Sequence, residues 1–276
     1  MLGKLIRHEF KATWMPMTLM FAGLLAASGL ARLFILLLDI FVEDETVATV
    51  FSMLITMMHM ILFAASLIVV FVFIATRFYN HLYSSQGYLT LMIPAPRWQL
   101  LFSKTIVSVT WYLLGTVAAV VSIVVLLSYT EMGYIYAEAF SMVGTSFEVS
   151  LGLDGSFMLI VSILSGIVSF FEGVLMLYCS ISIGQLFKKH RVVGAVLGYF
   201  CINTVINTVT SVITVISTIS QAAVLEAFEG QAERLKEITA LSTNITSAVM
   251  LLFTVLFTVI MYMITNYILK RAVNLQ

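Results

Sequence analysis

Residues 77–104 of the chain read RFYNHLYSSQGYLTLMIPAPRWQLLFSK and form the longest break in its hydrophobic pattern that still carries a net positive charge. Apolar and polar residues recur with helical spacing at the start of this segment, which predicts a short amphipathic helix up to Gly87, a residue that commonly ends helices. Pro94 and Pro96 exclude a continuous helix because each locks its φ angle and lacks an amide hydrogen. Pro96 then fits the first position of a second helix that continues into the next apolar stretch. We therefore expect a helix, a break and a second helix.

The composition of the whole chain is that of a membrane protein. Of its 276 residues, 61% are hydrophobic and 10% are charged, and the mean hydropathy is +1.06. Soluble domains contain about half apolar and a quarter charged residues. Six stretches reach the roughly 20 apolar residues of a spanning helix, at about 15–38, 48–76, 105–129, 156–184, 192–220 and 246–269. They lack the alternation of barrel strands. The sequence predicts an all-α integral membrane protein with six transmembrane helices in one domain, 1–276.

The charges outside these stretches predict an orientation. If the spans alternate, one side carries Lys4, Arg7, Lys11, Arg77, Arg97, Lys104, Lys188, Lys189, Arg191, Lys270 and Arg271. The other side carries most of the acidic residues, with Arg234 and Lys236 as its cations. Because basic loops stay inside, we expect both termini to be cytosolic. Cys179 and Cys201 fall within spans, so no disulfide framework is predicted.

The segments between the spans have separate predictions. Residues 2–14 are expected to form an interfacial amphipathic helix, with Leu2, Leu5, Ile6 and Phe10 opposite Lys4, Arg7, His8 and Lys11. A signal peptide is the alternative, but the apolar stretch at 15–38 exceeds the roughly 7–15 residues of its hydrophobic region. Residues 77–104 form a cytosolic coupling segment, and 130–155 and 221–245 are outer loops, the second with a helical composition.

Three ionisable residues lie within predicted spans. Arg32 lies near the outer end of the first span, where it reaches the acidic residues of the next loop or contacts a substrate. His59 lies near the middle of the second span and Glu172 within the fourth. Each must face protein or water, so it is either a structural hydrogen-bonding partner or a ligand for a proton or substrate.

The fifth span has a polar face. Asn203, Asn207, Thr210, Thr214 and Ser217 recur at spacings of four, three, four and three. Such spacing places them on one side of a helix. They form either interhelical hydrogen bonds, worth about 0.6 kcal/mol each, or the lining of a wet translocation path. The polarity over four turns favours a path, with a symmetric dimer interface as a possible setting.

Sequence motifs of enzymes are absent. The chain contains no phosphate-binding G-x-x-x-x-G-K-[ST], no H-E-x-x-H and no G-x-S-x-G. Its four histidines are scattered, so no metal site is predicted. We expect a protein that is not itself an enzyme, has no nucleic-acid partner, and takes energy for any transport from a partner or an ion gradient.

The chain resembles the permease subunits of bacterial type-2 ATP-binding-cassette exporters. The resemblance rests on the basic N-terminus, the six spans and the pattern QGYLTLMIPAPRWQLLFSK after the second span. It implies a permease paired with a second copy or a related permease, on two cytosolic ATPase subunits that bind ATP and Mg. The helix at 77–86 would then be the coupling helix. The resemblance assigns ATPase docking to Phe78, His81, Leu82, Tyr83 and Gln86, and the path to Asn203, Asn207, Thr210 and Thr214.

The expected function is export of a hydrophobic or amphipathic substrate, such as an antimicrobial peptide, a drug or a lipid, across the bacterial cell membrane. This chain would bind no cofactor itself. One alternative is a proton-coupled transporter that uses His59 and Glu172 without ATP. Another is an immunity or scaffold protein of the membrane that moves no substrate.

Overall fold

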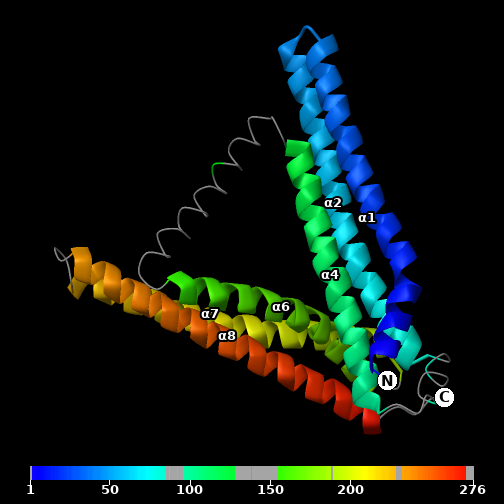
Figure 1. The fold of residues 1–276 in the computed structure, drawn as a ribbon, viewed down its shortest axis with the longest axis vertical. Helices are drawn as coiled ribbons and strands as arrows, with labels where there is room; N and C mark the ends of the chain where they lie inside the picture. Colours follow the sequence, from blue (N-terminus) through cyan, green and yellow to red (C-terminus); the bar gives the residue numbers. More distant parts are fainter. Residues whose placement is uncertain are drawn as a thin grey trace. The chain divides into compact units, whose positions relative to one another are not determined.

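The computed structural model describes residues 2–84, 87, 92, 96–127, 138, 155–187, 189–227 and 232–271. Within these residues the regular elements are helices and no strand occurs. Six helices are long and apolar enough to cross a membrane (Figure 1). This agrees with the all-helical membrane protein of six spans that the composition predicts.

The helices are longer than a bilayer requires. They are α1 (Leu2–Phe41), α2 (Glu45–Leu82), α4 (Arg97–Leu127), α6 (Gly155–Gly184), α7 (Arg191–Ala227) and α8 (Ala232–Arg271). Each contains between 30 and 40 residues. At a rise of about 1.5 Å per residue, all exceed a hydrocarbon core about 30 Å thick. Helices of this length would reach beyond both surfaces of such a core.

Two expected boundaries are absent. The predicted interfacial helix at 2–14 is continuous with the first span, and Pro16 lies inside α1 without ending it. The start of the 77–104 segment is the end of α2 rather than a separate helix, because no glycine or proline interrupts α2 before Leu82. The expected outer helix at 221–245 is also divided between the end of α7 and the start of α8.

The chain divides into two compact units. Unit 1 comprises Met1–Phe78 and Pro94–Phe140, and unit 2 comprises Tyr79–Ile93 and Ser141–Gln276. The boundary falls within the last turns of α2, so the coupling segment predicted from the sequence is shared between the units.

In unit 1, α1 and α4 are parallel neighbours. Trp111 Nε1 donates a hydrogen bond of 2.8 Å to Thr13 Oγ1. Further along both helices, a Cβ added at Gly115 would lie 3.3 Å from the Phe21 ring. Since both residue numbers increase together, the two helices run in the same direction. Trp111 also joins Met17 and Val107 in a buried apolar cluster.

The second helix of unit 1 runs antiparallel to α4. Val70 of α2 is 3.3 Å from the position of a Gly115 Cβ, and Phe73 packs against the apolar cluster. Earlier on α2, His59 contacts Ser122, which lies further along α4. Residue numbers therefore fall along α2 as they rise along α4. Unit 1 thus contains three helices, α1, α2 and α4, that run alongside one another, as Figure 1 shows.

In unit 2, α6 packs against both α7 and α8. Its side chains are buried without interruption from 174 to 182, which indicates a helix covered on all sides at this end. The start of α7 approaches α6 closely: a Cβ on Gly184 would lie 2.6 Å from the Arg191 carbonyl oxygen. Any larger residue at Gly184 would push the two backbones apart.

Candidate functional site

One carboxylate holds the two ends of the 77–104 segment in unit 1. Glu9 Oε2 accepts hydrogen bonds from Arg77 Nε at 3.2 Å and Nη2 at 2.9 Å. The other oxygen, Oε1, accepts from Lys104 Nζ. Arg77 is in the last turns of α2, and Lys104 is near the start of α4. Glu9 therefore bridges three helices at one level of unit 1.

Burial makes this bridge more than a surface contact. The side chains of Glu9, Arg77 and Lys104 are 15%, 21% and 5% exposed. Charged groups at such exposure need a counter-charge, since water no longer solvates them fully. Two cations share one carboxylate, so the cluster retains one positive charge. Its removal would affect α1, α2 and α4 together.

Aromatic packing fixes the helix that carries Glu9. Phe10 stacks on Trp111 with ring centroids 4.8 Å apart, and Ile6 packs against the cluster around Trp111. Thr13 Oγ1 donates to the Glu9 carbonyl at 2.9 Å while it accepts from Trp111. The apolar side of the N-terminal turns thus packs on α4, whereas its amphipathic pattern predicted contact with a lipid leaflet.

The residue that follows α2 is attached to α6 within unit 2. Tyr83 is 9% exposed, and its hydroxyl donates to Ser182 Oγ at 2.7 Å. Ser182 in turn donates to the Tyr178 carbonyl at 2.7 Å. Burial raises the pKa of Tyr83 to about 12 even though the bond to Ser182 opposes this shift. The hydroxyl therefore stays protonated and keeps its donor role at neutral pH.

A tight turn follows this tyrosine. The Gly87 amide donates to the Ser84 carbonyl at 2.8 Å. A Cβ on Gly87 would lie 2.7 Å from the Leu82 carbonyl oxygen, which is closer than real Cβ atoms approach. Glycine fits here because a side chain would meet the backbone at the end of α2. The expected helix end at Gly87 is wrong, since α2 already ends at Leu82 and Gly87 is itself helical.

The predicted docking residues differ in exposure. Phe78 and Leu82 are each 1% exposed, and Tyr83 is also buried. His81 is half-buried and Asn80 is exposed, while Gln86 lies outside the described residues. Asn80 and His81 are therefore accessible on this surface, whereas the side chains of Phe78, Leu82 and Tyr83 are buried inside the chain.

His59 has one hydrogen bond in the interior of unit 1. Its Nε2 lies 2.8 Å from Ser122 Oγ, and the two residues are 2% and 0% exposed. Its Nδ1 atom is buried with no hydrogen-bond partner within the described chain. Glu172, which belongs to α6 of unit 2, is half-buried. The pair proposed for proton transport is thus distributed over two units.

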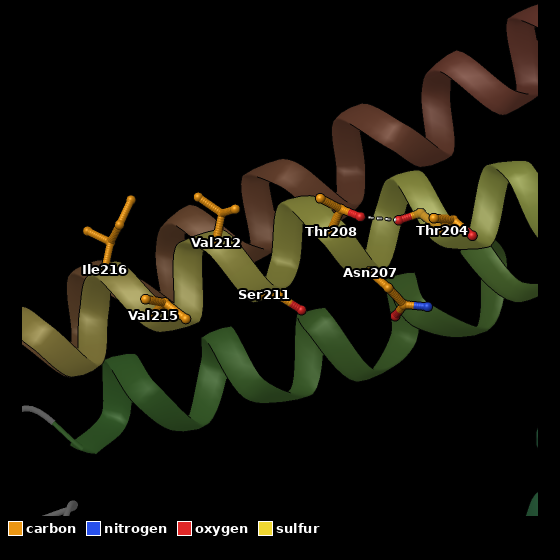
Figure 2. Close-up of a pocket in the computed structure, with 7 residues that line it drawn as sticks. All are labelled: Thr204, Asn207, Thr208, Ser211, Val212, Val215 and Ile216. Atoms are coloured by element: carbon orange, nitrogen blue, oxygen red, sulfur yellow. Dashed lines mark hydrogen bonds between the residues drawn. The ribbon is translucent and has the colours of Figure 1, made fainter.

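The polar face of α7 borders an open groove of about 560 Å³. Figure 2 shows the lining side chains along one helix; they are Thr204, Asn207, Thr208, Ser211, Val212, Val215 and Ile216. Asn207 is the one member shared with the predicted path residues. Its Nδ2 donates to Asn203 Oδ1 at 3.0 Å. The groove therefore lies beside the predicted stripe and overlaps it at Asn207.

The other stripe residues bond mainly within their own helix. The hydroxyls of Thr210 and Thr214 donate to the carbonyls of Ile206 at 3.0 Å and Thr210 at 2.9 Å. Ser217 reaches α8, where its Oγ lies 2.9 Å from Thr246 Oγ1. An interhelical hydrogen bond thus explains Ser217 at the end of the stripe, whereas Asn207 near its centre lines the groove.

The described part of the chain contains no cluster of three or more potential metal ligands. Cys179 and Cys201 are free thiols. No family model, curated protein or solved structure matches the chain.

The residues that complete these contacts were not predicted from the sequence. Glu9 was not singled out among the basic residues around it, and Ser122 and Ser182 carried no local signal. An acidic residue on the apolar side of a basic helix, four positions before Thr13, was the available clue to a buried ion pair.

Proposed function

We propose that the chain is the permease subunit of a bacterial ATP-binding-cassette exporter. Six apolar helices and the absence of enzyme motifs in the sequence support a membrane component that depends on another protein for energy. The observation that carries the proposal is the attachment of the segment after α2: Glu9 holds Arg77 and Lys104, and Tyr83 is bonded to Ser182.

A segment attached in this way can transmit force. A cytosolic ATPase that engages the exposed end of α2 would act on Asn80 and His81. Because Tyr83 is bonded to Ser182 of α6, displacement of this segment displaces α6 as well. Two separate ATPase subunits with ATP and Mg would supply the energy, and a second permease copy or a related one would complete the assembly. ATP binding shifts such a system only through unequal affinity for its two conformations.

The polar centre of α7 is the proposed path. Asn207 and the neighbouring hydroxyls of Thr204 and Thr208 offer hydrogen bonds, while Val212 and Ile216 offer apolar contact. This mixture suits a hydrophobic or amphipathic substrate better than a highly charged one. In the proposed orientation both termini are cytosolic and the chain lies in the cell membrane.

Co-expression with a candidate ATP-binding-cassette ATPase from the same genome tests the proposal. Asn80→Glu together with His81→Glu should reduce co-purification of the ATPase and substrate-stimulated ATP hydrolysis, because both changes alter the exposed end of α2. Glu43→Lys, in the connection between α1 and α2, is the matched control and should leave both unchanged. Retention of the ATPase and its stimulated activity in the double variant would refute the coupling assignment.

The second candidate is a proton-coupled transporter, which the buried His59 favours because its Nδ1 has no hydrogen-bond partner in the described chain. This candidate requires transport in liposomes driven by a pH gradient with no ATPase present. His59→Gln and Glu172→Gln should each abolish such transport. Gradient-driven transport that survives both changes would remove these residues from the mechanism.

A further inference from the structure

One side of the first three turns of α1 is basic and exposed. Lys4, Arg7, His8 and Lys11 are spaced by three, one and three residues, which places them on one helical face. All four are exposed, and no ion pair involves them within the described residues. We call Lys4, Arg7 and Lys11 the basic face of α1.

The opposite side of the same turns is already covered by protein. Ile6 packs against the cluster around Trp111, and Glu9 bonds to Arg77 and Lys104. α1 therefore cannot rotate to place its apolar side on a membrane without breaking these contacts. The surface it presents outward is the basic face.

This face adjoins an apolar membrane-spanning stretch. Trp14 and Met15 follow Lys11 and are 53% and 61% exposed. Exposed indole rings are typical of the boundary between headgroups and hydrocarbon. The basic face therefore lies at headgroup level, about 10 Å in length along the helix axis from Lys4 to Lys11.

The surrounding charge has the same sign. The adjoining ends of α1, α2 and α4 carry six cations, namely Lys4, Arg7, Lys11, Arg77, Arg97 and Lys104, and Glu9 is their single carboxylate. The Glu9 carboxylate bonds to Arg77 of α2 and Lys104 of α4, away from the basic face. Its negative charge is therefore neutralised by Arg77 and Lys104, and the electrostatic potential at the basic face is positive.

We propose that the basic face of α1 binds the phosphate headgroups of anionic phospholipids in the adjoining leaflet. A row of three cations about 10 Å long matches the headgroups beside one helix. Each cation near an anionic membrane surface raises affinity about fivefold, and the attraction weakens as salt screens it. This proposal does not depend on the ATPase or on transport.

Intrinsic fluorescence of the full chain tests the binding. A Trp98→Phe background leaves Trp14 beside the basic face and the buried Trp111. The protein is reconstituted in phosphatidylcholine vesicles that contain increasing fractions of brominated phosphatidylglycerol, whose bromines quench nearby indoles. Brominated phosphatidylcholine is the reference. We expect half-maximal quenching at a fraction of brominated phosphatidylglycerol about fivefold lower than the fraction of brominated phosphatidylcholine that gives the same quenching. A fivefold difference is about the effect of one cation.

Charge removal gives the decisive comparison. The triple variant Lys4→Gln, Arg7→Gln and Lys11→Gln should lose the preference, and Lys11→Gln alone should reduce it. A control variant with Lys189→Gln and Arg191→Gln, which are exposed residues of unit 2, should keep it. Circular dichroism checks that each variant is folded, and high salt should weaken the preference of the unaltered chain.

Three outcomes would overturn the proposal. The first is equal quenching by both brominated lipids in the unaltered chain. The second is a preference that survives in both the triple variant and Lys11→Gln. The third is loss of the preference on addition of millimolar inorganic phosphate, which would indicate a site for a free ion instead of a lipid.

Discussion

Glu9→Gln is expected to destabilise unit 1, because it leaves Arg77 and Lys104 without their counter-charge. At about 3 Å and an effective dielectric constant of about 20, one ion pair has a gross attraction of roughly 5 kcal/mol. Desolvation and the repulsion between the two cations offset much of this attraction. Removal of one partner from a buried pair costs about 3–5 kcal/mol. Because Glu9 and Arg77 keep 15% and 21% exposure, we expect a loss of about 3 kcal/mol in the free energy of unfolding.

Titration of detergent-solubilised protein with sodium dodecyl sulfate measures this loss, with circular dichroism for helix content. Fluorescence in a Trp14→Phe, Trp98→Phe background, which leaves Trp111 alone, reports the local packing. Glu43→Gln is the matched control, because Glu43 is exposed and forms no ion pair within the described residues. A surface substitution of this kind should change stability by less than about 0.5 kcal/mol.

A second substitution tests the electrostatic cause. Lys104→Met added to Glu9→Gln removes a cation that has lost its partner, so the double variant should recover about 1 kcal/mol or more relative to Glu9→Gln. The reasoning fails if Glu9→Gln behaves like the Glu43 control. It fails equally if the two losses add without recovery.

Three further predictions concern unit 2. Tyr83→Phe keeps the packed ring but loses the bond to Ser182, so stability should fall by about 1 kcal/mol, measured in the same titration; no change would exclude a formed bond. The pKa of Tyr83 is raised above 10 to about 12, so the folded state retains the phenol proton at higher pH than the unfolded state does. The contribution of the Tyr83 hydroxyl to the free energy of unfolding is therefore full below pH 10 and lost as the pH rises to about 12. Phenolate absorbance, measured against pH, should show a step near this pKa that Tyr83→Phe removes. Gly184→Ala should lower the free energy of unfolding by about 1–3 kcal/mol, because its Cβ would lie 2.6 Å from the Arg191 carbonyl oxygen. The control Gly166→Ala, whose Cβ would have no atom within 4 Å, should leave stability unchanged or raise it. Similar effects at both sites would refute the close approach.

The six helices follow from local composition. A run of about 20 apolar residues in a bilayer must satisfy its backbone hydrogen bonds internally, so it forms a helix whatever surrounds it. The end of α2 was not predicted: the helix was expected to run up to Gly87, whereas it ends at Leu82. The spacing of Asn203 and Asn207 correctly predicted two residues on one face, as their hydrogen bond requires.

Helix ends were less predictable. Amphipathic patterns at 2–14 and at the end of α2 suggested separate short helices, yet both continue their spans. A change from apolar to polar residues alters what a helix contacts without interrupting its backbone hydrogen bonds. Pro16 likewise lies inside α1 without ending it, so single residues did not predict where these helices end.

The contacts between helices needed three dimensions. Glu9 and its partners Arg77 and Lys104 are separated by 68 and 95 positions, and Tyr83 and Ser182 by 99. Hydrophobic periodicity indicates which residues share one face of a helix, but it does not indicate which other helix that face contacts. Which charges pair depends on which helices pack together, so only the tertiary structure shows that Glu9 bonds to Arg77 and Lys104. The formation of each helix, in contrast, follows from its own residues.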